Sequence, residues 1–475
     1  MRLFRCTVFF YCLLCCLYYV RGEDNRPNVI LVMADDMGWG DTGYNGHPRI
    51  KTPNLDSMAE AGFCLNRFYA AGPVCSPTRG SCLTGRNHNR FGISQANKGH
   101  LKKEEICLAE VFKIHGYQTG HFGKWHLGTL FDNYSGKGAK RQPELNYMTP
   151  GMSGFDEWFS TEFAVATYDP YKQSKLHEFK GDMRRGYVHN GKVIPQVLNG
   201  CDSKIIMDKA LPFIETCVKD TKPFFVVVWF HAPHAPIVGH PKYMKELYAD
   251  CDKDKQSYYS VITALDVQVG RLRKELRRLG VANNTMVCFS SDNGPEGDGK
   301  MKGRYQGSAS VLRGRKRSLY EGGIRVPGII EWPDRVEEGM VSDAPMVSSD
   351  YFVTCMDILG YTVADDRPYD GISLMPLFDG KKCKRGSNIG FWFENGHQEA
   401  LIGDHYKLVH NRSTKRSRSD NSTVPLYEYE LYDVVKDPSE TENIISSEPS
   451  VAREMKKELS LFIRSCKKSN AGEDY

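Results

Sequence analysis

Beyond its first 22 residues, this sequence lacks any apolar run long enough to cross a membrane. The longest later run, residues 224–230, has the length of a buried strand. The sequence also lacks a large excess of either charge. It has 63 basic and 58 acidic residues, and three of its arginines lie in residues 1–22, so nucleic-acid binding gets no support. Internal repeats and Cys/His spacings typical of zinc sites are absent too, which argues against solenoids and structural zinc.

The beginning of the chain is predicted to be a secretory signal peptide. Arg2 and Arg5 precede an apolar stretch, Cys6 to Val20, and Val20-Arg21-Gly22 offers small residues for cleavage. A signal anchor is the alternative, although the stretch is short for spanning. We therefore expect residues 1–22 to be removed, which leaves a secreted or lysosomal protein without a membrane span.

Cysteines and glycosylation acceptors agree with the secretory pathway. Eleven of the 15 cysteines follow the leader, and if Cys75 is set aside at most five disulfide bonds can form, with undetermined connectivity. These ten are Cys64, Cys82, Cys107, Cys201, Cys217, Cys251, Cys288, Cys355, Cys383 and Cys466. Four asparagines begin Asn-x-Ser/Thr acceptors and predict a glycoprotein: Asn133, Asn283, Asn411 and Asn421.

Strands and helices alternate through the first two thirds of the chain. Apolar runs of strand length occupy residues 28–34, 117–122, 224–230 and 285–290. Helices are predicted after Pro53, over 204–218 with a bend at Pro212, and over 257–279, whereas 132–200 is predicted as long loops with short elements. This alternation predicts an α/β fold with a large, mainly parallel sheet flanked by helices.

The pattern changes from about residue 345. Strand-like pieces at 389–393, 405–410 and 428–432 precede an amphipathic helix over 451–466, which predicts a small antiparallel sheet with one packing helix. We divide the chain into a signal peptide (1–22), a large domain (23–345) and a smaller α+β domain (346–475). The basic segment 412–418 is interpreted as a solvated loop in preference to a site for an acidic polymer.

The run Cys75-Ser76-Pro77-Thr78-Arg79-Gly80 is predicted to open a helix. Ser76 is a candidate N-cap, Pro77 suits the first helical position, and Gly85 would end the helix after Thr84. Free N–H groups at such a helix start favour a bound anion. Taken alone, however, a Cys-x-Pro-x-Arg pattern could be a stray cysteine in a loop.

Polar clusters follow four predicted strands: Asp35-Asp36, Lys124 with His126, His231 with His234, and Asp292-Asn293. In open α/β sheets, ligands bind beyond the carboxyl ends of the strands. If the four strands are parallel neighbours, these clusters meet Cys75 at one rim and form a site for a charged oxyanion. The acidic and amide side chains supply only oxygen, which suits Ca²⁺ or Mg²⁺. Each acidic pair alone could be a helix cap or a solvated loop, but two pairs after buried strands predict one divalent cation.

These motifs resemble those of the sulfatase family, and the similarity covers nearly all of the mature sequence. Cys75 matches the residue that sulfatases oxidise to formylglycine (3-oxoalanine), and Arg79 matches the arginine of the same motif. The other matches are Asp35 and Asp36 in Ala-Asp-Asp-Met-Gly-Trp-Gly-Asp, Lys124 and His126 in Gly-Lys-Trp-His-Leu-Gly, His234 before Ala-Pro, Asp292-Asn293, Lys316 before Glu-Gly-Gly, and the tail Glu430-Leu-Tyr-Asp433 with Asp437-Pro438. The sequence departs from the pattern at Arg315 and Arg317, where many members have glycine.

The resemblance implies an alkaline-phosphatase-like fold, catalysis by residues 23–345, and hydrolysis of sulfate monoesters, such as aryl sulfates and sulfated carbohydrates. A formylglycine-generating enzyme would oxidise Cys75 during secretion, and the hydrated aldehyde, a geminal diol, would attack sulfur. One divalent cation, Ca²⁺ in preference to Mg²⁺, would be held by Asp35, Asp36, oxidised Cys75, Asp292 and Asn293.

The family's remaining residues imply roles at the sulfate. Lys124, His234 and Lys316 would hold sulfate oxygens. Arg79 would orient the diol, and His126 would take the proton of its second hydroxyl, which expels sulfate. His231 is interpreted as a packing or supporting residue.

Two other classes stay open. A phosphate or phosphonate ester hydrolase of this architecture would normally use two metals and a Ser or Thr nucleophile, whereas this sequence offers ligands for one metal and a cysteine. A glycan-binding or matrix protein that lost catalysis would usually lack a metal or nucleophile residue, and none is missing here. The sequence leaves open the natural substrate and whether the chain forms a homo-oligomer.

Overall fold

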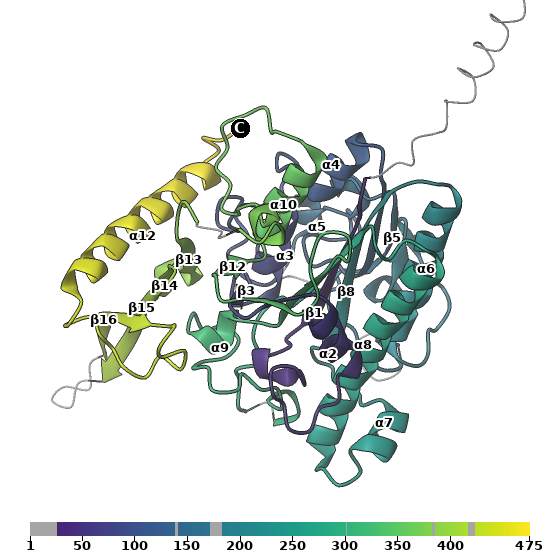
Figure 1. The fold of residues 1–475 in the computed structure, drawn as a ribbon, viewed down its shortest axis with the longest axis horizontal. Coiled ribbons are helices and arrows are strands. Elements are labelled where there is room, and N and C mark those ends of the chain that lie inside the picture. The colour runs from purple at the N-terminus through teal and green to yellow at the C-terminus, as the bar shows by residue number, and fades with distance from the viewer. Residues whose placement is uncertain (1–25, 138–140, 172–182, 301, 382–384, 417–422) are drawn as a thin grey trace, which may run out of the picture.

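A computed structural model describes residues 26–475 except 138–140, 172–182, 301, 382–384 and 417–422. The predicted signal peptide, Cys383 and Asn421 lie outside the described residues. A large sheet with helices around it forms the main body, and a small sheet covered by one long helix lies beside it (Figure 1). Within the described residues, no helix is both long and apolar enough to span a bilayer.

The large sheet has ten strands in the order β11-β2-β10-β9-β1-β8-β4-β5-β6-β7. Its centre is parallel and consists of β9 (Thr285–Ser291), β1 (Asn28–Asp35), β8 (Phe224–Pro233), β4 (Gln118–Lys124) and β5 (Glu157–Thr161). Antiparallel pairs occur toward the edges, at β10 (Gly328–Glu331) with β9 and β2 (Phe63–Leu65), and at β6 (Val188–His189) with β5 and β7 (Lys192–Val193). The edge strand β11 (Met340–Ser342) is parallel to β2. The predicted mainly parallel α/β sheet is confirmed, and β5, β6 and β7 are short elements within residues 132–200, which were predicted as long loops with short elements.

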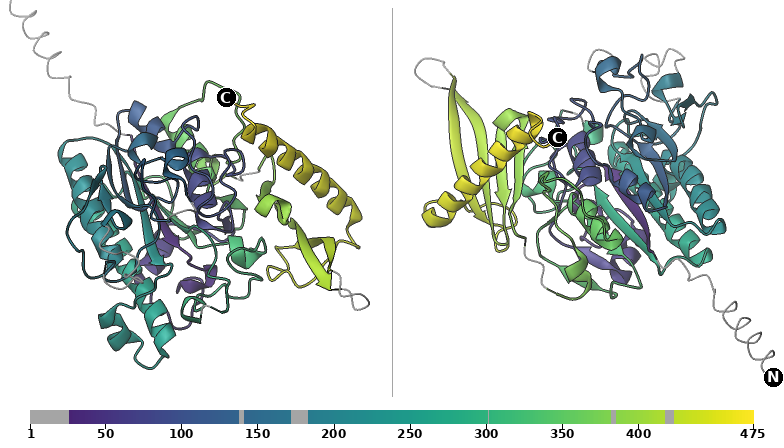
Figure 2. Two further views of the ribbon diagram at one scale, coloured as in Figure 1. Left: turned by 180° about the vertical axis from the view of Figure 1, so that it is seen from behind. Right: turned by 90° about the horizontal axis from the view of Figure 1, so that it is seen from above.

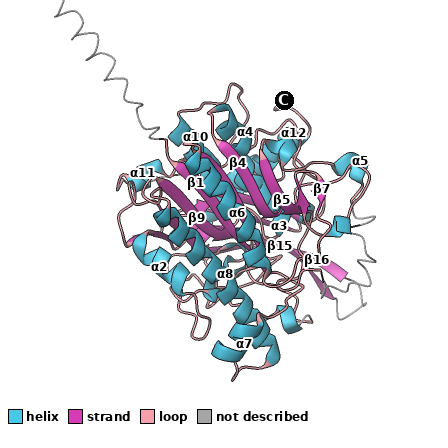
Figure 3. Cartoon of the chain, turned by 90° about the vertical axis from the view of Figure 1, so that its right-hand side faces the viewer, coloured by secondary structure: helices cyan, strands magenta, loops and turns pink. Residues whose placement is uncertain are grey.

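Helices cover both faces because alternate side chains of a central strand point to opposite sides. Val29, Leu31 and Met33 of β1 belong to one core cluster, while Ile30 and Val32 belong to the other. Figure 3 shows the strands of the large sheet with helices packed around them. The second cluster is covered by three predicted helices, α2 (Pro53–Ala61), α6 (Asp202–Lys219, with Pro212 inside) and α8 (Lys253–Arg278). The first is covered by α3 (Cys75–Thr84), α4 (Leu108–Ile114), α10 (Asp350–Leu359) and α11 (Met375–Phe378).

Helix α3 begins two residues earlier than the sequence suggested. Val74, in an extended conformation, is the N-cap, and Cys75 is the first helical residue. The predicted N-cap Ser76 is therefore wrong, because its hydroxyl donates to the carbonyl oxygen of His126 (2.8 Å) and so ties the helix start to a neighbouring loop. The predicted end is confirmed, since Gly85 adopts the left-handed conformation (φ 69°) and its N–H bonds the Ser81 carbonyl.

The predicted small antiparallel sheet and its helix are confirmed. It comprises β13 (Ile389–Phe393), β14 (Gln398–Ile402), β15 (Tyr406–Arg416) and β16 (Thr423–Asp433), and α12 (Pro449–Asn470) packs Met455 and Leu459 against it. Figure 2 shows α12 lying across this sheet. Residues 412–416 extend β15 instead of forming the predicted loop, because they pair with β16. The domain division at residue 345 stays a prediction, although α10 and α11 pack in the core of the large sheet.

The structure bears on the predicted disulfide bonds and on the positions of the glycosylation acceptors. All ten described cysteines are free thiols, so none of the predicted disulfide bonds is present in the described part of the chain. Among the glycosylation acceptors, Asn133 and Asn283 are exposed. Asn411 is partly buried, and its amide donates to the Tyr320 hydroxyl (2.8 Å).

Buried charges connect the two sheets. The Lys407 ammonium of β15 lies 3.0 Å from Glu321 and 2.9 Å from Glu440, and all three side chains are fully buried. Glu440 also accepts the backbone N–H of Glu321 (2.7 Å), which opens α9 (Glu321–Ile324). This ion cluster therefore anchors the segment that follows Lys316.

We expect Lys407→Met to destabilise the protein by about 3–5 kcal/mol, because it leaves buried carboxylates without their cation. Urea unfolding followed by tryptophan fluorescence measures the difference. Lys436→Met is the control, since Lys436 pairs with Asp433 at the surface with its side chain 85% exposed, and such pairs contribute little. Equal midpoints for the two variants would contradict the prediction.

Candidate functional site

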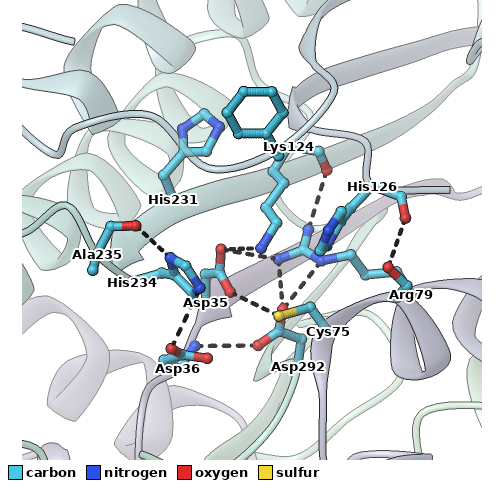
Figure 4. A network of polar contacts seen from close by, with 12 residues as sticks. Asp35, Asp36, Cys75, Arg79, Lys124, His126, His231, His234, Ala235 and Asp292 are labelled. Atoms are coloured by element: carbon cyan, nitrogen blue, oxygen red, sulfur yellow. Dashed lines mark hydrogen bonds and ion pairs between the residues drawn. The ribbon is translucent and has the colours of Figure 1, made fainter. Parts of the chain in front are cut away.

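Four neighbouring parallel strands, β9-β1-β8-β4, bring the predicted polar clusters to one edge of the large sheet. Asp35 ends β1, Lys124 ends β4, and Asp292 directly follows β9. His234 follows β8 by one residue. Parallel strands present their carboxyl ends together, so side chains far apart in the sequence, such as Arg79 and Asp292 at 213 positions, meet in one polar network (Figure 4).

Cys75 enters this network from the first position of α3. Its buried thiol lies 3.6 Å from Asp35 Oδ1 and 3.6 Å from the Lys316 ammonium. Free N–H groups at the start of a helix favour negative charge at this point. Burial, then the charge of Asp292, raises the pKa of the thiol to about 12, so it is protonated at neutral pH.

Arg79 lies one turn further along α3 and is fully buried. Its guanidinium donates to Asp292 Oδ2 (3.1 and 2.7 Å) and to the Lys124 carbonyl (3.1 Å). It also lies 5.0 Å from the ring centre of Trp229, a cation–π distance. These three partners fix the guanidinium beside Cys75, where it faces the acidic side of the network.

Each of the three buried carboxylates pairs with a cationic side chain, yet the pKa values of Asp36 and Asp292 shift in opposite directions. Burial and the charge of Asp35 raise the pKa of Asp292 to about 6. Burial also opposes ionisation of Asp36, but Lys316 and His234 outweigh it and lower the pKa of that carboxyl. Lys124 pairs with Asp35 (2.6 Å), and Lys316 forms a close ion pair with Asp36.

The donor set fits a divalent cation. Ligand atoms of Asp35, Asp36, Cys75 and His234 all lie within 4.8 Å of one another. Asn293 donates its amide N–H to Asp36 (2.8 Å), while its Oδ1 is buried without a hydrogen-bond partner among the described residues. An orphaned buried oxygen beside clustered carboxylates is the arrangement that a hard cation would complete.

His126 is held in a left-handed conformation (φ 60°) above the helix start. Its Nε2 lies 2.8 Å from Asn97 Oδ1, and its Nδ1 has no hydrogen-bond partner among the described residues. Burial, followed by the charges of Lys124 and Arg141, lowers the pKa of the imidazole well below its usual value. The ring is therefore neutral at physiological pH. Asn97 gave no signal in the sequence.

The two histidines after β8 have different surroundings. His234 is partly exposed, with Nε2 3.7 Å from Asp36 and Nδ1 2.5 Å from the Ala235 carbonyl oxygen. His231 is fully buried and lies 2.7 Å from both Asp202 and Thr161. His234 faces the acidic cluster, whereas His231 is engaged in a separate internal network, as a supporting residue would be (Figure 4).

Comparisons with known proteins agree on one family. Residues 27–361 match the sulfatase family, and residues 314–465 match the family described as N-sulphoglucosamine sulphohydrolase, C-terminal. The chain is 30% identical to N-acetylgalactosamine-6-sulfatase of Sus scrofa (89% of this chain, 82% of the relative) and 31% identical to that of Mus musculus (75% and 66%). The fold resembles the PsFucS1 sulfatase from Pseudoalteromonas sp. (TM-score 0.76, 24% identity, 94% and 92% covered).

Proposed function

Because the chain belongs to the sulfatase family, whose members are hydrolases of sulfate esters, we propose that it hydrolyses sulfate monoesters at the Cys75 site. The observation that carries this proposal is the position of Cys75, at a helix start and 3.6 Å from both a carboxylate and a lysine ammonium. We further propose that Cys75 acts as formylglycine. The buried, protonated thiol is a poor nucleophile as it stands.

A hydrated formylglycine has two hydroxyl groups, which suits a two-step reaction. One hydroxyl attacks sulfur and displaces the alcohol, and loss of the proton from the other then expels sulfate and restores the aldehyde. His126 fits the role of the base for that second proton, since it is neutral with one ring nitrogen unengaged among the described residues. Arg79, beside Cys75, fits the role of orienting the diol.

Lys124 and Lys316 fit the role of holding sulfate oxygens, because both ammonium groups pair with carboxylates of the acidic cluster. Lys124 comes from the end of β4, and Lys316 comes from the segment before α9. His234, the partly exposed member, would bind the sulfate on its open side. Asp35, Asp36, Asp292 and Asn293, with an oxygen on residue 75, would hold one divalent cation, for which we favour Ca²⁺ over Mg²⁺. A bound cation would offset the carboxylate charge and polarise the oxygens beside it.

Mass spectrometry of the tryptic peptide that contains Cys75 tests the nucleophile. In protein secreted from cells that make formylglycine, we expect an aldehyde in place of the thiol. Hydrolysis of 4-nitrocatechol sulfate compared with 4-nitrophenyl phosphate tests the reaction, since a phosphatase of this fold would prefer the phosphate. An unmodified thiol throughout, or turnover of the phosphate alone, would overturn the proposal, and turnover of neither ester would favour a non-catalytic glycan-binding protein.

We propose sulfated carbohydrates as the natural substrate class and a secreted or lysosomal location. The names of the relatives in Sus scrofa and Mus musculus, N-acetylgalactosamine-6-sulfatases, support the substrate class. Maturation by a formylglycine-generating enzyme is part of the same proposal. A panel of sulfated mono- and disaccharides is the measurement that identifies the substrate.

A further inference from the structure

We propose that Arg317 and Arg304 form a second anion-binding subsite at the mouth of the active site, which binds a sulfate or carboxylate carried by the same substrate molecule. The substrate would then be a sulfate monoester on an acidic glycan fragment that carries a second anionic group. This inference rests on the proposed sulfatase function and deepens it.

A buried carboxylate organises the two arginines. Glu296, whose side chain is 2% exposed, lies 2.8 Å from Arg304 and forms a close ion pair with Arg317. Burial opposes its ionisation, but the hydrogen bonds from Arg317 and the charge of Lys316 lower the pKa of Glu296 to about 2. Glu296 therefore holds both guanidinium groups in place. Both side chains also reach solvent, since Arg304 is 26% exposed and Arg317 is 44% exposed.

This pair adjoins the proposed nucleophile. Arg317 follows Lys316, whose ammonium lies 3.6 Å from the Cys75 sulfur. The Arg317 backbone N–H donates to the carbonyl of Pro73 (2.9 Å), two residues before Cys75, and the Lys316 N–H donates to Pro295 (2.9 Å). Lys316 is buried, whereas Arg317 is substantially exposed, so the positive charge extends from the acidic cluster outward to the surface.

The backbone at Arg317 gives an independent reason to look for a role of its side chain. Its φ is +73°, a left-handed conformation that suits glycine and disfavours residues with a β-carbon. Glycine would occupy this position without strain. Since strained residues cluster where a side chain has a function, an exposed arginine retained here points to a ligand that needs its guanidinium.

Guanidinium groups bind sulfate and carboxylate through paired hydrogen bonds. Arg317 lies outside the cluster around Cys75, so a group bound there would lie beyond the sulfate to be cleaved, on the same or a neighbouring sugar. Such a contact is the same in the bound substrate and the transition state, and so should lower KM more than it changes kcat.

The test compares Arg317→Gly with the unaltered enzyme on four substrates. They are 4-nitrocatechol sulfate, a monosulfated neutral disaccharide, the same disaccharide with a neighbouring uronate, and the same disaccharide with a second sulfate. We expect the ratio of kcat/KM for a doubly anionic disaccharide to that for the aryl sulfate to fall about tenfold, mainly through KM. Arg317→Lys should restore part of this ratio, and the uronate and second-sulfate substrates show which anion is bound.

Arg335→Gln is the matched control, because Arg335 is 41% exposed and paired with Asp379 away from the site. The subsite would be overturned if Arg317→Gly left the ratio of kcat/KM values unchanged. It would also be overturned if kcat/KM fell equally on all four substrates, since the ion pair with Glu296 would then have a purely structural role. If the unaltered enzyme hydrolyses no sulfate ester, the proposed function fails instead. In that case, calorimetry tests the subsite separately by comparing the affinity of the disulfated disaccharide for Arg317→Gly with its affinity for the unaltered protein. Equal affinities would contradict the subsite.

Discussion

Replacing Cys75 with alanine should lower turnover of an aryl sulfate by about 10⁴-fold or more, the scale on which loss of a nucleophile acts in other enzymes. Alanine can neither be oxidised to formylglycine nor attack sulfur. Cys75→Ser should also fail to turn over, for a different reason. A serine hydroxyl can take the sulfuryl group, but it has no second hydroxyl with which to expel sulfate. We therefore expect a covalently sulfated serine, detectable by mass spectrometry of the intact protein after exposure to substrate.

Cys82→Ala is the matched control for this experiment. Cys82 lies on the same helix, is fully buried and belongs to the core cluster behind the site. Its replacement removes one sulfur atom from the core, so the folded enzyme should keep turnover within a few-fold. If Cys75→Ala and Cys82→Ala retained similar activity, residue 75 would not be the nucleophile.

The sequence could predict where the site lies because of one simple rule. Buried strands are readable as continuous apolar runs, and residues 28–34, 224–230 and 285–290 match β1, β8 and β9 closely. The polar residues that directly follow such strands lie at the carboxyl edge of the sheet. The sequence alone does not establish that these strands are neighbours, and the order β9-β1-β8-β4 shows that they are.

The partners of the site residues could not be predicted in the same way. Asn97 reaches His126 from a loop, and Glu296 gathers Arg304 and Arg317 through side-chain contacts that no periodicity encodes. The sequence allows short elements within residues 132–200 but does not locate β5, because a five-residue run is too short to distinguish from a loop before its pairing with β4 is known.

The N-cap was displaced for a similar reason. Ser76 has a residue type that favours capping, but tertiary contact decided otherwise, since its hydroxyl bonds His126 instead of a helical N–H. The same contact joins the loop of the proposed base to the helix of the proposed nucleophile. Local propensity thus located the helix, and a non-local hydrogen bond fixed which residue begins it.

Removing the divalent cation should abolish turnover, and the structure points to Asn293 as the residue that best reports on it. Treatment with EGTA followed by desalting should leave inactive protein with a lower melting temperature, because a ligand that binds only the folded state stabilises it. Ca²⁺ should restore both quantities more effectively than Mg²⁺, since a crowded set of carboxylates suits the cation that takes more oxygens.

Asn293→Ala should then raise the Ca²⁺ concentration for half-maximal thermal stabilisation by about 10–100-fold. The variant loses the buried Oδ1, which has no hydrogen-bond partner among the described residues, together with the hydrogen bond to Asp36. Asn293→Asp separates these two losses, because it keeps an oxygen but cannot donate to Asp36. Near-normal Ca²⁺ dependence in Asn293→Asp would identify the oxygen as the ligand. Asn284→Ala, at the other end of β9, is the control, and an EGTA-treated enzyme that stays fully active would rule out a catalytic cation.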